Sequence, residues 1–145
     1  MITISRTFTV AAPASAVLAY LRDLGNTAEW DGRRTTRVGA GPVAVGARWL
    51  GESRILGVRT ELTYTLVEAD GDRLVFAGRS EGAGSTETVT VRPAPDGSEV
   101  VYRVDVEVHG LAKLAAPVLR MQLEKLGTES AGRLTAVLNG LAAAA

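Results

Sequence analysis

The stretch GLAKLAAPVLRMQLEKLGTESAGRLTAVLNGL, residues 110–141, decides the fold. Its large apolar residues recur in steps of four, three, eight, four and three, which places them on one face of an α-helix. They are Leu119, Leu123, Leu126, Leu134, Leu138 and Leu141. Pro117 suits a first helical turn, where its missing N–H costs no hydrogen bond, so we predict a regular helix from about Ala116. Such a long helix needs a large apolar surface to pack on.

The chain before this helix is typical of strands and tight turns. Apolar and polar residues alternate in most of its segments, as they do in an antiparallel sheet that has one face on the core and the other in water. A short amphipathic helix is predicted over Pro13–Leu24, with one more turn over Asn26–Trp30. Strands are predicted at Thr3–Val10, Thr35–Val38 (near an edge), Ala47–Ser53, Val58–Glu68, Arg73–Arg79, Glu87–Arg92 and Glu99–His109. We therefore predict an α+β protein with about six to seven strands around a long C-terminal helix.

Composition narrows the class of protein. The chain has 145 residues, of which 46% are hydrophobic, so residues 1–145 are predicted to form one domain with a substantial core. Sixteen basic and sixteen acidic residues cancel, which leaves no overall field to attract nucleic acid. The N-terminus lacks the apolar run of a signal peptide, and no run approaches the ~20 apolar residues of a membrane span. We expect a cytoplasmic protein with no membrane span.

The order of the motifs resembles a known superfamily. A first strand leads through Ala12-Pro13 into the short helix, and Glu29-Trp30-Asp31 follows. Val45-Gly46-Ala47-Arg48-Trp49, the hairpins and a Gly110-Leu111 junction into the terminal helix complete the order. This chain resembles the SRPBCC group, the START-like or helix-grip superfamily, and within it the polyketide cyclase/dehydrase-type branch.

The resemblance implies a curved antiparallel sheet that grips the long helix and encloses an internal, largely apolar cavity. A bent sheet and a straight helix cannot pack flush, so space for a ligand remains. The implied ligand-binding residues lie on the apolar strand faces, on the helix and at the two tryptophans. They are Trp30, Trp49, Leu62, Tyr64, Leu66, Val89, Tyr102, Val104, Leu119, Leu123 and Leu126.

Polyketide aromatase/cyclases of this superfamily are thought to use an arginine inside the pocket to polarise a carbonyl or enolate, which requires a cation aimed into a dry cavity. On the corresponding strand of this chain the inward row is Thr60, Leu62, Tyr64 and Leu66, with no arginine. Three side chains remain as catalytic candidates: Tyr64, Arg79 on the next strand, and Glu87 if it is buried. For Glu87 we favour a position at a rim in water, and for Arg79 a solvated strand end.

Other kinds of site are not indicated by the sequence. The chain has no cysteine, and its one histidine, His109, is expected on the surface near the start of the long helix, so we expect no metal site. The segment Gly39–Gly46 lacks the lysine and spacing of a phosphate-binding loop, and no basic-aromatic cluster indicates nucleic-acid binding. We expect no cofactor. Whether the protein is a monomer or a homodimer is not decided by the sequence.

Three functions remain. We favour binding or transport of a small hydrophobic ligand, such as a lipid, polyketide or isoprenoid-like molecule, without catalysis. The first alternative is a polyketide cyclase, aromatase or dehydratase, which an inward arginine or a buried acid paired with a tyrosine would favour. The second alternative is a protein-interaction module, which a core filled by its own side chains would favour.

Overall fold

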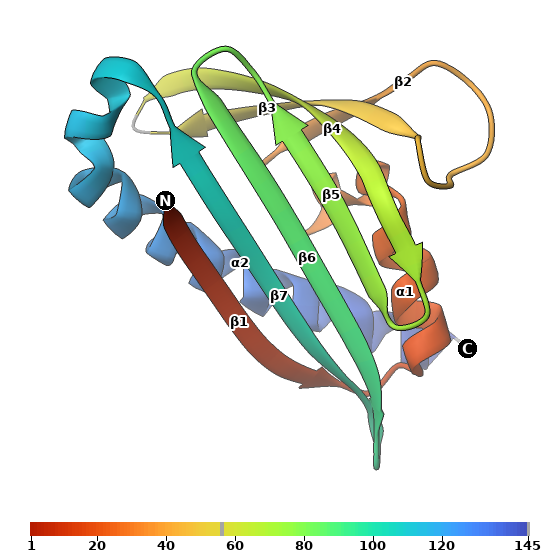
Figure 1. The fold of residues 1–145 in the computed structure, drawn as a ribbon. Coiled ribbons are helices and arrows are strands. Elements are labelled where there is room, and N and C mark those ends of the chain that lie inside the picture. Colours follow the sequence, from red (N-terminus) through yellow and green to blue (C-terminus); the bar gives the residue numbers. More distant parts are fainter. Residues whose placement is uncertain (56, 145) are drawn as a thin grey trace.

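A computed structural model describes the backbone of residues 1–55 and 57–144, and the side chains of these residues except 55, 111, 112, 143 and 144. Seven strands, two α-helices and two 3₁₀ helices (η1 and η2) follow one another along the chain (Figure 1). Their order is β1 (Ile2–Val10), α1 (Ala14–Arg22), η1 (Leu24–Glu29), β2 (Arg34–Val38), β3 (Arg48–Ile55), β4 (Val58–Asp70), β5 (Arg73–Arg79), β6 (Ala83–Ala94), β7 (Gly97–Val108), η2 (Gly110–Ala115) and α2 (Ala116–Ala144).

All seven strands form one antiparallel sheet in the order β1-β7-β6-β5-β4-β3-β2. The sheet curves, and α2 runs along one face of it (Figure 1). This architecture confirms the predicted helix-grip fold, and β2 does lie at an edge. The long helix begins at Ala116, as Pro117 in its first turn predicts.

The short N-terminal helix ends earlier than predicted. Its last residue is Arg22, because Asp23 adopts an extended conformation and its side chain accepts a hydrogen bond from the N–H of Gly25 at 2.9 Å. This bond caps η1, which carries the chain on to Trp30. The helical turn predicted at Asn26–Trp30 is therefore part of a longer 3₁₀ segment.

The core lies between the sheet and the C-terminal half of α2. Leu134 and Leu138 of α2 are buried, and they belong to the same cluster as apolar residues from β4, β5, β6 and β7. The strand members of this cluster include Leu66, Phe76, Val89, Val91 and Val100. Burial of each such side chain contributes about 1.5–3 kcal/mol, so this end of the molecule holds the two layers together.

The N-terminal half of α2 is packed differently. It lies close to the edge strand β1, where a Cβ atom at Gly127 would be 3.0 Å from Cγ2 of Ile4. Its leucines at 119, 123 and 126 are only partly buried. The helix thus approaches the sheet closely at one edge and leaves its leucines facing a space over the middle strands.

We predict that Gly97→Ala destabilises the fold by about 2 kcal/mol or more. Gly97 closes the β6–β7 hairpin with φ of 152°, and a Cβ atom there would clash with the carbonyl oxygen of Val10. The matched control is Gly132→Ala in α2, where nothing lies within 4 Å of the added atom. This control should stabilise the protein by about 0.5–1 kcal/mol because alanine favours the helix. Urea unfolding of both variants measures the difference; equal effects would contradict the packing described at Gly97.

Candidate ligand-binding cavity

A cavity of about 450 Å³ lies between the inner face of the sheet and the N-terminal half of α2. This volume is within the range of pockets that hold small organic molecules. Its walls are mostly apolar. They include Ile4, Phe8, Trp30, Leu62, Val104, Val106, Leu119, Leu123 and Leu126. Hydroxyl-bearing residues interrupt the apolar surface at Ser53, Thr60, Ser85 and Ser130.

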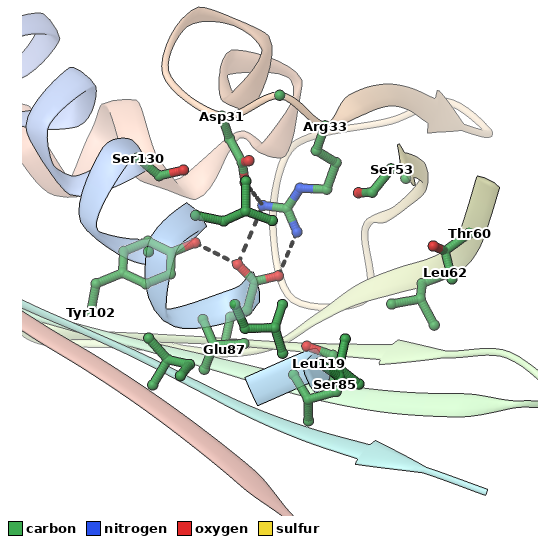
Figure 2. A pocket seen from close by; sticks show the side chains of 18 of the residues that line it. Asp31, Arg33, Ser53, Thr60, Leu62, Ser85, Glu87, Tyr102, Leu119 and Ser130 are labelled. Atoms are coloured by element: carbon green, nitrogen blue, oxygen red, sulfur yellow. Dashed lines mark hydrogen bonds and ion pairs between the residues drawn. The ribbon is translucent and has the colours of Figure 1, made fainter. Parts of the chain in front are cut away.

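One end of the cavity carries a buried ion pair between Arg33 and Glu87. Nη1 of Arg33 donates to Oε2 of Glu87 at 2.6 Å, and Nη2 donates to Oε1 at 3.3 Å. The hydroxyl of Tyr102 also donates to Oε1, at 2.5 Å, and Asp31 lies 3.4 Å from Nη2 of Arg33. Figure 2 shows Arg33 and Tyr102 approaching Glu87 from different sides. We call Asp31, Arg33, Glu87 and Tyr102 the polar cluster.

Because the polar cluster is buried, its charged groups cost free energy to remove from water. Glu87 is 3% exposed and Arg33 is 7% exposed. Removing such charges from water costs several kcal/mol per ion, which is recovered only when the partners are well placed and further hydrogen bonds are made. Both Glu87 oxygens have donors here, whereas Nε of Arg33 has no hydrogen-bond partner among the described residues. The cluster is therefore held in place on the strand side and retains an unused donor on the arginine side.

Arg33 lies over the ring of Tyr64, and two glycines leave room for that ring. A Cβ atom at Gly51 would lie 2.5 Å from the Tyr64 ring, and one at Gly78 would lie 2.8 Å from it. Because both neighbouring strands lack a side chain at this point, the ring has room between them. The Arg33 guanidinium carbon lies 4.8 Å from the ring centroid, a cation–π arrangement. The glycines of β3 and β5 thus position Tyr64, and Tyr64 supports Arg33.

The ionisation states follow from burial and from the partners. Burial alone would raise the pKa of Glu87, but the Arg33 charge and the hydrogen bonds from Arg33 and Tyr102 outweigh it and hold that pKa below its usual value. Burial, with the Glu87 charge, raises the pKa of Tyr102 well above its usual value, so the phenol keeps its proton. Burial also raises the pKa of Asp31, although Arg33 opposes that shift. Burial disfavours the charge on Arg33, yet Glu87 keeps its pKa well above the usual value.

The structure distributes the predicted ligand-binding residues between the cavity and the core. Eight of them line the cavity: Trp30, Leu62, Tyr64, Tyr102, Val104, Leu119, Leu123 and Leu126. Three others, Trp49, Leu66 and Val89, do not line it and are buried in the core. Trp49 packs edge-on against Phe76, with ring centroids 6.1 Å apart, whereas Trp30 packs edge-on against Tyr102 at 5.6 Å. Of the two tryptophans, only Trp30 belongs to the cavity wall.

Of three polar side chains considered from the sequence, the structure buries one and exposes the other two. The expected position of Glu87 at a rim in water is wrong, because Glu87 points inward from β6 and is buried with Ser85 and Val89. Arg79 is exposed, as expected for a strand end, and its Nη1 donates to the carbonyl oxygens of Gly78 and Ser85. Arg79 is not among the lining residues. His109 is exposed, in agreement with its predicted surface position.

Sequence reasoning missed Arg33 and Asp31. They lie in the irregular segment between η1 and β2, where no periodicity shows which way a side chain points. The sequence nevertheless contained a signal for a buried acid. Along β6, Glu87 lies on the same face as Val89 and Val91, whereas Thr86 and Thr88 lie on the other face. A buried acid requires a cation or several donors. An inward arginine does exist, but it comes from this segment instead of from β4.

In the part of the chain that the structure describes, no group of three or more histidine and carboxylate side chains is placed to hold a metal ion. Within residues 1–55 and 57–144, no helix is long and apolar enough to cross a membrane.

The family described as "Polyketide cyclase / dehydrase and lipid transport" matches residues 1–139. The chain belongs to this family. Comparison with curated proteins gives no match. The family description covers both enzymes and lipid carriers, so membership alone does not choose between catalysis and binding.

Several solved structures share the fold of this protein. The Zhui aromatase/cyclase from Streptomyces sp. R1128 aligns with a TM-score of 0.73 at 15% identity, covering 97% of this chain and 92% of that one. A START superfamily protein from Mycobacterium smegmatis aligns with a TM-score of 0.69 at 17% identity, covering 95% and 94%. The di-domain ARO/CYC StfQ from the steffimycin pathway aligns with a TM-score of 0.73 at 14% identity, covering 98% of this chain and 52% of that one. At these identities the likeness shows a shared fold.

We predict that Glu87 makes the free energy of unfolding of the protein fall at acidic pH. Since its folded-state pKa lies below the usual value of 4.5, its contribution to stability is present above that pH and is lost as the pH falls through the folded pKa. Glu87→Gln should lower the free energy of unfolding at pH 7 by about 3 kcal/mol, because Arg33 loses its main partner. It should also flatten the fall in stability below about pH 4.5. Urea unfolding across this pH range measures both effects.

Tyr102→Phe provides a graded comparison for the same experiment. This variant removes one hydrogen bond to Glu87 and leaves the Arg33 charge in place. Its acid dependence should therefore fall between those of the wild type and Glu87→Gln. An acid dependence in Glu87→Gln identical to that of the wild type would show that Glu87 is not held ionised by the cluster.

Proposed function

We propose that the protein binds a small, largely apolar molecule in the cavity between the sheet and α2. The observation that carries the proposal is the cavity itself, of about 450 Å³, with apolar walls and one ordered polar end. Apolar contact would supply most of the affinity, at about 25 cal/mol per Å² of apolar surface buried. The description of the family, which includes lipid transport, supports the same reading.

The polar cluster would orient the ligand. An oxygen atom of the ligand placed beside the cluster finds N–H donors on Arg33, whereas the single Tyr102 proton is already donated to Glu87. Serine hydroxyls of the wall lie around the same cavity. Since Nε of Arg33 has no partner among the described residues, an acceptor on the ligand would satisfy a donor that is otherwise buried without one. We therefore expect the ligand to carry a carbonyl or hydroxyl group at one end.

The volume of the cavity argues against the interaction-module alternative, which requires a core filled by its own side chains. Such a module would fill this space with its own side chains, whereas the described residues of this protein leave it open. Well-packed protein interiors have few voids larger than a water molecule. A space of this size between two layers is more readily explained as a binding site.

The first test is to identify what the protein carries. Native mass spectrometry of the purified protein, followed by organic extraction, should reveal an apolar molecule bound one to one. A protein without ligand, whose mass is not shifted by a panel of fatty acids, isoprenoids and polycyclic phenols, would contradict the proposal.

A variant that fills the cavity gives the second test. Leu123→Trp adds volume on the cavity-facing side of α2 and should lower the affinity for the identified molecule by about tenfold or more. Val67→Trp, on an exposed position of β4, is the matched control and should bind as the wild type does. Fluorescence or calorimetric titration measures both. Equal affinities in the two variants would place the ligand elsewhere.

A cyclase-type enzyme is the second candidate, and the inward Arg33 paired with Glu87 and Tyr102 favours it. This arrangement contains an inward arginine and a buried acid bonded to a tyrosine, the two features expected to favour this alternative. The neighbouring aromatase/cyclase folds are compatible with the idea. Glu87 would remove a proton beside a substrate carbonyl, and Arg33 with Tyr102 would stabilise the resulting enolate oxygen.

The pKa of Glu87 constrains the substrate of such a reaction. A lowered pKa keeps the carboxylate ionised but makes it a weak base, so the C–H bond must be acidic, as it is between two carbonyl groups. The enolate carbon then attacks another carbonyl of the same molecule, and the new alkoxide takes the proton back from Glu87. This intramolecular aldol addition balances without an external reactant, and loss of water would follow.

A linear poly-β-ketone thioester analogue tests this candidate. The wild type should accelerate the appearance of cyclised, conjugated product, which absorbs in the near ultraviolet. Glu87→Gln should reduce the rate by about a hundredfold or more, the size expected for loss of a general base. A wild-type rate equal to that of buffer would refute catalysis and leave the binding proposal to be judged by its own titrations.

A further inference from the structure

The cavity opens toward the end of the molecule formed by the β3–β4 hairpin and η2. Arg54, Val58 and Ala115 line the cavity and are exposed, so they mark its mouth at this end. Figure 1 shows η2 and the start of α2 near this hairpin. Two other exposed lining residues, Gly32 and Arg133, belong to the opposite, polar part of the cavity.

Large apolar side chains are exposed beside this mouth. Leu114 is 83% exposed, Val118 is 56% exposed and Met121 is 74% exposed. Steps of four and three place them on one side of η2 and α2, opposite the leucines that face the cavity. Across the mouth, Val58 is 64% exposed. A protein whose cavity mouth stayed in water would gain no stability from exposing these apolar side chains. Their exposure therefore indicates that this surface contacts another molecule.

The same segment is basic although the whole chain is neutral. Residues 110–123 contain Lys113 and Arg120 and no acidic residue, which gives a net charge of +2 (two basic minus zero acidic). Both side chains are exposed, and so is Arg54 on the hairpin. Glu124, the first acidic residue after the segment, has its charge paired with Arg6 at 3.4 Å. Glu81 is outside the segment, on the loop between β5 and β6.

We propose that this mouth face, defined as Lys113, Leu114, Val118, Arg120, Met121 and Val58, docks on the surface of an anionic lipid bilayer. Apolar side chains that project from a helix beside exposed lysine and arginine are typical of segments that lie in the headgroup layer. Anionic lipid headgroups attract the basic side chains, and the apolar ones enter the boundary of the acyl chains.

A second copy of the chain fits this face less well. In a two-fold symmetric dimer the same patch meets itself, so the net charge of +2 on residues 110–123 would face an equal positive charge on the partner. Leu114, Val118 and Met121 also project from helical segments, and a partner helix would need a groove to receive them. A lipid surface needs no matching groove and supplies the opposite charge.

Docking in this orientation would bring the cavity mouth to the lipid surface. If the cavity takes an apolar ligand, which rests on the proposed function, that ligand passes between membrane and cavity without crossing water. The docking itself does not depend on ligand binding, so the two can be measured separately.

Vesicle flotation tests the docking. The wild type should bind mixed phosphatidylcholine–phosphatidylglycerol vesicles more tightly than pure phosphatidylcholine vesicles, and less tightly as salt is raised. Leu114→Ser/Met121→Ser and Lys113→Glu/Arg120→Glu should each weaken binding to the mixed vesicles by about tenfold or more. The control Val45→Ser/Val67→Ser, at apolar residues 60% and 46% exposed elsewhere, should bind as the wild type does.

Three outcomes would overturn the proposal: no binding of the wild type to either vesicle, equal binding to both, or an equal loss in the control variant. If light scattering instead shows a dimer that the mouth-face variants dissociate, and the wild type ignores vesicles, a second copy occupies this face. Ligand titration of the same variants separates the two proposals. Affinity for a cavity ligand in detergent-free buffer should not change when the mouth face is altered.

Discussion

Glu87 places a carboxylate among buried apolar residues of a central strand, and the site depends on how that charge is balanced. A buried carboxylate without partners would cost several kcal/mol, so the chain must bring a cation to it. Arg33 meets this requirement from the segment between η1 and β2, and Tyr102 of β7 completes the hydrogen bonds. The ion pair therefore holds an irregular segment over the inner face of the sheet and forms the polar end of the cavity.

The rest of the cavity follows from the mismatch between a curved sheet and a long helix. The C-terminal half of α2 reaches the core through Leu134 and Leu138, whereas near its middle Gly127 lies close to Ile4 of β1. Leu119, Leu123 and Leu126, which precede these contacts along α2, face a space that the side chains of the middle strands do not fill. One helix thus supplies the packing that stabilises the fold and a wall of the site, and its outer side provides the proposed contact with lipid.

Regular elements were predictable because their periodicity is a property of the local sequence. The alternation in β4, β6 and β7 gave the inward row correctly, including Tyr64 and Tyr102, and the leucine spacing gave α2 from Ala116. Arg33 was not predictable in this way, because its direction is set by a partner 54 residues away along the chain. Trp49 illustrates the same limit: sequence shows a large aromatic residue on a strand, but only the packing against Phe76 separates core from cavity wall.

The central claim is that a ligand occupies this cavity with its oxygen against the polar cluster. A crystal structure of the protein as purified, without added ligand or lipid, tests that claim most directly. The account predicts continuous non-protein density between the sheet and α2, ending beside Arg33 and Tyr102, with the Arg33–Glu87 pair intact. A structure in which Leu62, Leu119 and Leu123 close the space, or in which Arg33 extends into solvent, would contradict it.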